Sequence, residues 1–273
     1  MIEKLIQSTP DETLNRILAE LVTGWETILE DNFLGSYLGG SFAHGGWHAY
    51  SDVDFNVVIR QDPDHHKLEA LKALHAGVFT QETYYARHLE GSFIPAEVLA
   101  DLDRTDIPVW YLDNGSLNFE RSTHDNTLVN RWVLREKGVV LAGSHPSIWI
   151  PPVPEEQLKT EVWGTMQGWA EEIRAGKSKL DNRFYQAFAV LIYCRMLHSL
   201  VTGQIQGKPA GAAWGLENLG PEWNSLIEDA INTCPHQYDK IWEPADPEKL
   251  ARTYNFISYA LDVGPSFWES VQR

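Results

Sequence analysis

The residues of this sequence best suited to chemistry are two aspartates that follow a segment rich in glycine and serine. Asp52 and Asp54 come after Gly39-Gly40-Ser41, with ten residues between the two groups. On a strand, side chains two residues apart project from the same face, so both carboxylates can reach one point. Such a pair repels unless a proton or a cation intervenes, and Mg²⁺ prefers carboxylate and phosphate oxygens. The pair therefore predicts a Mg²⁺ site.

Gly40 and Ser41 indicate that an anion would bind beside that metal. Glycine lets the backbone approach a ligand closely, and a serine that begins a helix points its hydroxyl and N–H groups at an anion. Metal-binding acids next to such a segment specify a nucleotide site, where the metal offsets the charge of a departing pyrophosphate. An Asp-x-Asp pair alone is more often a cap at a strand edge or turn. The Gly-Ser at this spacing favours the nucleotide site.

The same segment resembles a known signature. Gly40-Ser41 followed by Ser51-Asp52-Val53-Asp54 is similar to the signature of the DNA polymerase β-like nucleotidyltransferase superfamily. The longer string from Leu38 to Asp54 resembles the aminoglycoside 3''/9-adenylyltransferase family more narrowly. The likeness continues beyond residue 200 in three further places: Val201-Thr202-Gly203-Gln204-Ile205, Lys208 and Ala213-Trp214.

The resemblance implies a specific reaction. Members of this family use MgATP, and we expect two magnesium ions and ATP as the co-substrate. A sugar hydroxyl would attack the α-phosphorus, take up AMP and release pyrophosphate, with the substrate held in a cleft between two domains. By the same match, Asp52 and Asp54 would be metal ligands, and Gly40 and Ser41 would hold the triphosphate.

A third acid is needed to accept the proton of the attacking hydroxyl. The segment Leu89-Glu90-Gly91-Ser92-Phe93-Ile94 resembles the family strand that supplies the catalytic glutamate. This match nominates Glu90 as the general base, which must lie within hydrogen-bond reach of the attacking oxygen. The alternative is a solvated glutamate at a strand edge.

Arg195 is notable without any resemblance. It is the only formally charged residue between Arg183 and Lys208, and it shares an apolar helical face with Phe188 and Leu191. Burying an unpaired guanidinium is costly, so Arg195 must meet a carboxylate, backbone carbonyls or a ligand phosphate. One alternative is an ion pair with an acid of the first domain. The resemblance favours a phosphate contact shared with Lys208, because both positions match basic residues that contact ATP in the family.

Periodicity indicates the elements that would position these residues. Thr9 as N-cap and Pro10 at the first helical position predict a helix that ends near Asp31. Alternating β-rich runs predict strands interleaved with helices, which indicates a mixed α/β first half. The predicted strands are 33–40, 52–59, 88–95, 109–112 and 139–142, and the predicted helices lie around 68–74 and over 126–137.

Three prolines among residues 151–154 predict a linker, and helical periodicity follows around 162–173, 184–192 and 250–261. We therefore expect an α+β protein in two domains. The resemblance implies that residues 1–150 are a polymerase-β-like nucleotidyltransferase domain with a mixed sheet. It likewise implies that residues 151–273 are an all-α helical bundle that clamps substrate and nucleotide.

Composition restricts the partners. Lys and Arg number 22 against 38 Asp and Glu, giving a net charge of −16, which argues against a protein that grips duplex nucleic acid and suits a small cationic acceptor. No apolar run approaches the ~20 residues of a membrane span, and the start lacks a signal-peptide pattern. Cys194 and Cys234 lack metal-ligand spacing. We expect a cytoplasmic monomer or weak dimer with no nucleic-acid or membrane partner.

The leading hypothesis is a Mg-dependent O-nucleotidyltransferase that transfers AMP from ATP to a hydroxyl of an aminoglycoside or aminocyclitol. Tyr185 falls where family members carry an acid that grips the amines of the acceptor, with Asp181 one turn earlier. The acceptor therefore stays open. The alternatives are an enzyme of the same fold acting on a protein or another non-antibiotic acceptor, and a non-catalytic nucleotide-binding regulator.

Overall fold

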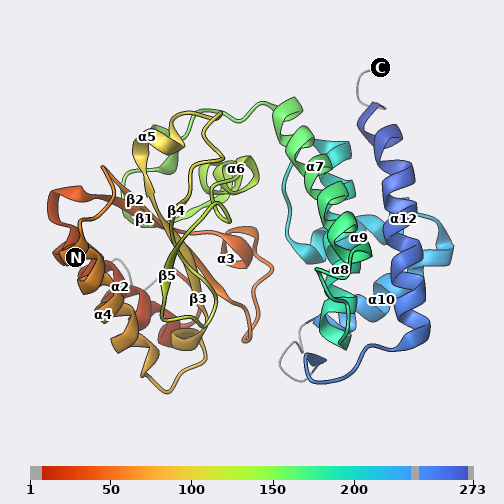
Figure 1. Ribbon diagram of the computed structural model, residues 1–273, viewed down its shortest axis with the longest axis horizontal. Coiled ribbons are helices and arrows are strands. Elements are labelled where there is room, and N and C mark those ends of the chain that lie inside the picture. The colour runs from red at the N-terminus through yellow and green to blue at the C-terminus, as the bar shows by residue number, and fades with distance from the viewer. Residues whose placement is uncertain (1–7, 235–239, 270–273) are drawn as a thin grey trace. The chain divides into compact units, whose positions relative to one another are not determined.

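The computed structural model describes residues 8–234 and 240–269 and divides the chain into two compact units (Figure 1). The first unit is Met1–Val153 and the second is Pro154–Arg273. The division falls in the proline-rich segment, where prolines lack the N–H that a helix or a strand would use.

The first unit is built on a six-stranded sheet with the order β5-β4-β3-β2-β1-β6. Strands β2 and β3 are parallel and the other neighbours are antiparallel, so the predicted mixed sheet is confirmed. Parallel neighbours need a crossover connection, and a helix supplies it between β2 and β3. The strands are β1 Phe33–Leu38, β2 Val53–Ile59, β3 Leu89–Pro95, β4 Val109–Leu112, β5 Phe119–Ser122 and β6 Val139–Gly143.

Helices lie on both faces of this sheet. On one face, the long helices α2 and α4 bury apolar side chains such as Trp25, Phe55 and Phe93 in the larger core. On the other face, α6 contributes Leu134 to a smaller core that includes Val58. The helices of this unit are α2 Glu12–Leu29, α3 Gly40–His44, α4 His65–Phe79, α5 Ala96–Leu99 and α6 Leu128–Lys137, with 3₁₀ turns at Glu30–Asn32, Tyr85–Arg87 and Pro146–Ile148.

The alternation of side chains along β2 decides where polar groups collect. Phe55 and Val57 belong to the core under α2 and α4, so Asp54 and Asn56 project from the opposite face. Val58 continues that second face into the smaller core. One face of the strand therefore changes from polar to apolar along its length, and the polar end carries the predicted site.

Two local predictions are wrong. The N-cap of α2 is Asp11 rather than Thr9, because the Asp11 carboxylate accepts hydrogen bonds from the backbone N–H groups of Thr13 and Leu14. Thr9 instead hydrogen-bonds to the side chain of Asn15. The first strand was expected to reach Gly40, but β1 ends at Leu38 and the short helix α3 begins at Gly40.

In the second unit, the described elements are helices, apart from one isolated bridge between Asn182 and Pro244. Helix α8 is central and packs against the other four. It is long and apolar enough to cross a membrane, but 72% of that window is buried within the protein, as in a core helix. The helices are α7 Glu155–Arg174, α8 Arg183–Thr202, α9 Lys208–Asn218, α10 Asn224–Thr233 and α12 Pro247–Glu269, with a 3₁₀ turn at Pro221–Trp223.

Candidate active site

The backbone at Gly40 lies directly against the carboxylate of Asp54. Gly40 has a φ of +47°, and a Cβ added there would lie 1.7 Å from Asp54 Oδ2. The preceding residue fixes this approach, because the N–H of Gly39 donates a 2.9 Å hydrogen bond to the carbonyl oxygen of Asp54. Only glycine fits such a position, both for space and for backbone conformation.

Ser41 occupies the first turn of α3, one residue after that approach. Its Oγ atom is buried and has no hydrogen-bond partner among the residues that the structure describes. A buried hydroxyl without a partner is unfavourable, so it indicates a place where a ligand oxygen would bind. Gly40 and Ser41 thus offer backbone access and an available hydroxyl beside one of the predicted acids.

Asp54 and Glu90 are direct neighbours across the parallel strands β2 and β3. Register partners project from the same face of a sheet, so the two carboxylates share one side. Asp52 immediately precedes β2 and is half-buried. The chain therefore gathers the predicted acids at one end of β2 and β3, next to α3.

Asp52 and Asp54 could hold a hard divalent cation only together with further oxygen ligands from a substrate. No group of three or more His, Cys, Asp and Glu residues in the described part of the chain could hold a metal ion by itself. Mg²⁺ is commonly bound by one or two carboxylates and completes its shell with substrate phosphates and water. Asp52 and Asp54, beside a glycine backbone that a phosphate could approach, match that mode.

Glu90 is held by two side chains that contact the same oxygen atom. Tyr111 Oη donates a 2.6 Å hydrogen bond to Glu90 Oε1, and His124 Nε2 lies 3.3 Å from that atom. The side chain of Glu90 is 18% exposed and comes from a strand inside the sheet. This placement differs from a solvated glutamate at a strand edge, and it suits a base that must meet a substrate.

A second acid, Asp125, interacts electrostatically with Glu90. Burial raises the pKa of Asp125 to about 6, against an opposing hydrogen bond from Ser92 Oγ at 2.8 Å. The hydrogen bond to Glu90 is the main cause that raises the pKa of His124. The surroundings of Glu90 thus combine an acid and an imidazole, each with a raised pKa, and one phenol.

In the second unit, α8 and α9 carry the two predicted basic residues. Arg195 is half-buried in the middle of α8, and Lys208 is the first residue of α9. The two helices pack closely, since a Cβ added at Gly211 would lie 2.6 Å from the Cα of Arg195. The Nζ atom of Lys208 lies 4.8 Å from the centre of the Phe188 ring, in a cation–π arrangement.

The start of α8 shows where the expected acceptor-gripping acid would be. Tyr185 is 41% exposed in the first turn, which follows the N-cap Asn182. Asp181 is exposed and precedes the N-cap, so it lies outside the helix rather than one turn earlier along it. Neither position supplies a carboxylate from within α8.

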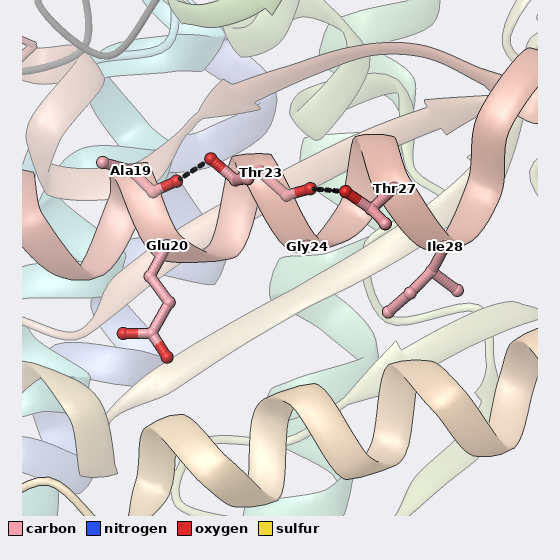
Figure 2. A pocket seen from close by; sticks show the side chains of 6 residues that line it. All are labelled: Ala19, Glu20, Thr23, Gly24, Thr27 and Ile28. Carbon is pink, nitrogen blue, oxygen red and sulfur yellow. Dashed lines mark hydrogen bonds between the residues drawn. The ribbon is translucent and has the colours of Figure 1, made fainter.

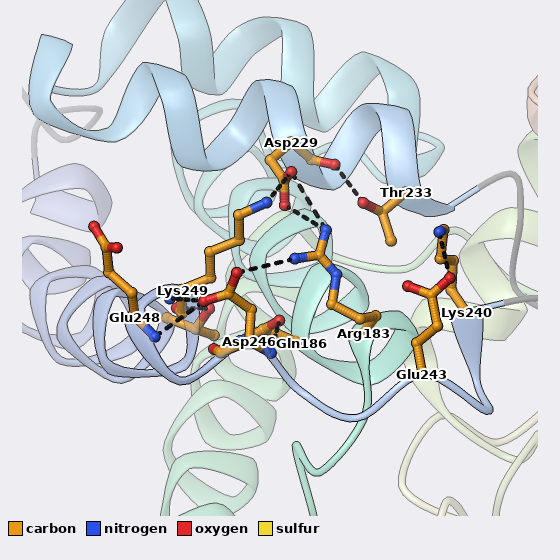
Figure 3. A network of polar contacts seen from close by, with 10 residues as sticks. Arg183, Gln186, Asp229, Thr233, Lys240, Glu243, Asp246, Glu248 and Lys249 are labelled. Carbon is orange, nitrogen blue, oxygen red and sulfur yellow. Dashed lines mark hydrogen bonds and ion pairs between the residues drawn. The ribbon is translucent and has the colours of Figure 1, made fainter.

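Nearby charges have structural partners. Asp229 of α10 contacts both Arg183 and Lys249, and Arg183 also lies 3.6 Å from Asp246 (Figure 3). These pairs connect the start of α8 with α10 and with the start of α12. They stabilise the helical unit, and we assign them no role toward substrate.

A hollow in the first unit lies away from the predicted residues. It runs along α2, where Thr23 and Thr27 turn their hydroxyls back onto backbone carbonyls four residues earlier (Figure 2). Its lining includes none of the predicted site residues and consists of Ala19, Glu20, Thr23, Gly24, Thr27 and Ile28.

Comparison with known proteins shows which proteins this chain resembles. Residues 149–259 match the family described as "Aminoglycoside adenylyltransferase, C-terminal domain". An aminoglycoside (3'') (9) adenylyltransferase from Klebsiella pneumoniae is 24% identical over 250 residues, which cover 84% of this chain and 88% of that protein. A spectinomycin 9-adenylyltransferase from Campylobacter jejuni is 22% identical over 235 residues, covering 83% and 87%. The second unit is thus similar to the C-terminal domain of that family, and most of the chain is similar to aminoglycoside adenylyltransferases.

A solved structure shares the fold. The spectinomycin adenyltransferase AAD(9) from Enterococcus faecialis, crystallised with ATP and spectinomycin, superposes with a TM-score of 0.69 at 16% identity. The match covers 90% of this chain and 98% of that one. This structure confirms the predicted α+β fold, and the relatives together bear out the predicted resemblance and the nucleotidyltransferase class. The roles of individual residues stay predictions.

The sequence did not point to Tyr111, His124 or Asp125 as neighbours of Glu90. Tyr111 lay in the predicted strand 109–112, but which residue of β3 it meets depends on the register of two strands separated by a loop. His124 and Asp125 follow β5, a strand that was not predicted. No local pattern could have revealed these contacts.

Proposed function

We propose that this protein transfers AMP from ATP to a hydroxyl of an aminoglycoside or aminocyclitol, in a Mg-dependent reaction that releases pyrophosphate. The names of its relatives support adenylyl transfer to such an acceptor. The observation that carries the proposal is the placement of Asp54 and Glu90 as neighbours on β2 and β3, with the Gly40 backbone against Asp54.

Each residue of the first unit has a distinct part in this proposal. The backbone of Gly40 and the partnerless hydroxyl of Ser41 would hold the triphosphate. Asp52 and Asp54 would hold Mg²⁺. When bound, the metal would offset the negative charge of the triphosphate and of the departing pyrophosphate.

Glu90 would act as the general base. As the acceptor oxygen bonds to the α-phosphorus, its proton passes to the Glu90 carboxylate. The bond between the α-phosphorus and the oxygen bridging to the β-phosphate then breaks, and that oxygen leaves with pyrophosphate. Glu90 is partly exposed, so an acceptor hydroxyl and water can both reach it.

Arg195 and Lys208 would add positive charge against the triphosphate, as the family resemblance implies. We expect Arg195→Ala to raise the dissociation constant of MgATP about tenfold to a hundredfold, the usual range for a lost charge-assisted hydrogen bond. Isothermal titration calorimetry measures the change. Lys177→Ala removes an exposed charge from the same unit and should leave the constant unchanged. Equal effects of the two substitutions would contradict the assignment.

The acceptor is the least constrained part of the proposal. A net charge of −16 favours cationic molecules, which include aminoglycosides. Tyr185 offers a ring and a hydroxyl where the family carries an acid, so we expect the preference among acceptors to differ from that of the relatives. A panel that includes streptomycin-type, spectinomycin-type and other hydroxylated amines is therefore needed.

The deciding experiment measures pyrophosphate release from MgATP with that panel. We expect turnover with at least one acceptor, a product heavier by one AMP, and loss of turnover in Asp54→Asn. Asp31→Asn, at an exposed position outside the site, is the matched control and should keep full activity. Tight MgATP binding with no turnover on any acceptor would contradict the small-molecule acceptor, and adenylylation of a protein would support the alternative.

A further inference from the structure

Tyr111 reaches Glu90 from the neighbouring strand. In the antiparallel pair of β3 and β4, Tyr111 lies opposite Ser92, so its side chain projects from the same face as Ser92 and Glu90. Its Oη atom is 2.6 Å from Glu90 Oε1 and 3.1 Å from Asp113 Oδ1. The residue is only 4% exposed, so few other conformations are open to its ring.

The phenol can donate its proton to one carboxylate at a time. Burial, followed by the hydrogen bond to Glu90, raises the pKa of Tyr111 well above its usual value, so the hydroxyl keeps its proton and acts as a donor. Asp113 is exposed, and water can solvate its charge. Glu90 has much less access to water and makes the shorter contact, so it is the carboxylate that accepts the hydrogen bond from Tyr111.

Other charged groups act on Glu90 from every side. Asp54 lies opposite on β2, and Asp113 and Asp125 add negative charge nearby. His124 contacts the same oxygen as Tyr111, but its side chain is 61% exposed. Tyr111 is therefore the buried neutral donor that fixes the carboxylate among several acids.

We propose that Tyr111 is a positioning residue for the transfer reaction, which holds the Glu90 carboxylate in the orientation that accepts the proton of the acceptor hydroxyl. The inference rests on the proposed function of Glu90 as the general base. A base must lie within hydrogen-bond reach of the proton it removes, so its orientation affects the chemical step more than the binding of either substrate. Tyr111 itself touches no substrate in this proposal.

The test is the kinetics of Tyr111→Phe, which keeps the ring and removes the hydroxyl. We expect kcat to fall about tenfold to a hundredfold, as for the loss of a hydrogen bond to a charged group, while KM for ATP and for the acceptor stays within about twofold. In a Glu90→Gln background, Tyr111→Phe should reduce the residual rate by less than about twofold, because the residue it positions is already altered.

Tyr37→Phe is the matched control. Tyr37 is fully buried in the same sheet, and its hydroxyl donates a 2.8 Å hydrogen bond to the carbonyl of Ser144. Both variants should lower the melting temperature by a few degrees, but Tyr37→Phe should leave kcat unchanged. Rescue of part of kcat by Tyr111→His or Tyr111→Gln, which restore a donor, would add support.

Three results would overturn the inference. An unchanged kcat in Tyr111→Phe, an equal loss of kcat in Tyr37→Phe, or an undiminished effect in the Glu90→Gln background each contradicts positioning through Glu90. A wild-type enzyme without turnover contradicts the proposed function instead, and the role of Tyr111 falls with it. If the wild type turns over and Tyr111→Phe has an unchanged kcat, only the inference about Tyr111 is overturned.

Discussion

The contact between Gly40 and Asp54 allows no side chain at position 40. We expect Gly40→Ala to reduce turnover more than about a hundredfold, because the new Cβ would displace the Asp54 carboxylate and the positive φ would be strained. Pyrophosphate release and MgATP calorimetry would measure the loss. Gly77→Ala is the control, since nothing lies within 4 Å of a Cβ at that position of α4. Normal turnover in Gly40→Ala would show that this approach is not needed.

At the scale of single residues, the sequence indicated the candidate acids but not the side chains around them. The spacing from Gly40-Ser41 singled out Asp54, and Glu90 was nominated because its segment resembles a family strand. Tyr111 and His124 reach Glu90 through strand register and through a turn after β5. Such contacts join residues far apart in the sequence, so local sequence patterns do not predict them.

Arg131 shows the same limit in a structural role. It is fully buried in α6, and its guanidinium donates to the carbonyls of Asp101 and Arg104 and to the side chain of Asn126. Nothing in the local sequence indicated that this charged residue would be buried, since its acceptors come from two loops, the one after α5 and the one before α6. The residue fastens those loops to α6.

We expect Arg131→Met to lower the free energy of unfolding by about 3 kcal/mol, because several buried acceptors would lose their donor. Urea denaturation followed by circular dichroism measures this loss. Arg16→Met, at an exposed position on α2, should change stability by less than about 0.5 kcal/mol. If Arg131→Met left the free energy of unfolding unchanged, water would have to replace the guanidinium as the hydrogen-bond donor.

At the scale of elements, the closeness of α8 and α9 depends on small residues. We expect Gly211→Ala to force the helices apart, because the added Cβ would approach the Arg195 backbone to 2.6 Å. The melting temperature should fall by several degrees, and MgATP binding should weaken if Arg195 and Lys208 contact phosphate. Calorimetry and thermal unfolding measure the two effects.

The control for that change is Gly164→Ala in α7, where a Cβ would meet nothing within 4 Å. It should be neutral or slightly stabilising, since alanine favours a helix over glycine by about 1 kcal/mol. A Gly211→Ala variant that melts and binds like Gly164→Ala would contradict the importance of this packing.

The elements that sequence patterns predicted are those with a strong apolar period. The strands around Val53–Ile59, Leu89–Pro95 and Val109–Leu112 were found because their runs are β-rich and buried. Strand β5 was missed because Phe119–Ser122 is short and mostly polar, and α9 was missed because its sequence contains proline and glycine. Neighbouring elements, rather than intrinsic preference, stabilise these two.

At the scale of the whole molecule, we expect the free energy of unfolding to depend on pH through His75, which lies in the core of the first unit. Burial lowers the pKa of His75 to about 3, and its Nε2 accepts a hydrogen bond from Trp25. The folded state therefore binds fewer protons than the unfolded state, whose histidine titrates near 6.5. The contribution of neutral His75 to the free energy of unfolding is fully present above pH 6.5. It is lost as the pH falls from 6.5 toward 3, by up to ~1.4 kcal/mol per pH unit.

We expect the melting temperature of the wild type to fall more steeply between pH 7 and pH 5 than that of His75→Gln, which can still accept from Trp25 but does not titrate. Asp125, with its raised pKa, acts in the opposite direction over part of this range, so the difference between variants is the quantity to compare. Exposed His66→Gln should keep the slope of the wild type. Parallel slopes for all three proteins would exclude His75 as the sensor.

The predicted boundary near residue 150 rests on proline density, and the division of the structure after Val153 falls in the same segment. The mixed sheet was an expectation from the family resemblance, whereas periodicity was enough to predict strands interleaved with helices followed by an all-helical part. The internal order of the sheet did not follow from it, since β6 returns to pair with β1 across more than a hundred residues. Long-range pairing of this kind depends on the whole chain.

The packing of α8 against α9 also buries the thiol of Cys194, with Gly215 leaving the space that its sulfur fills. Burial raises the pKa of this thiol to about 12, so almost no thiolate forms at neutral pH. Alkylating reagents attack the thiolate and must also reach it. The rate at which iodoacetamide modifies Cys194 therefore reports how often the helical unit opens, and bound nucleotide that stabilises α8 and α9 would slow it.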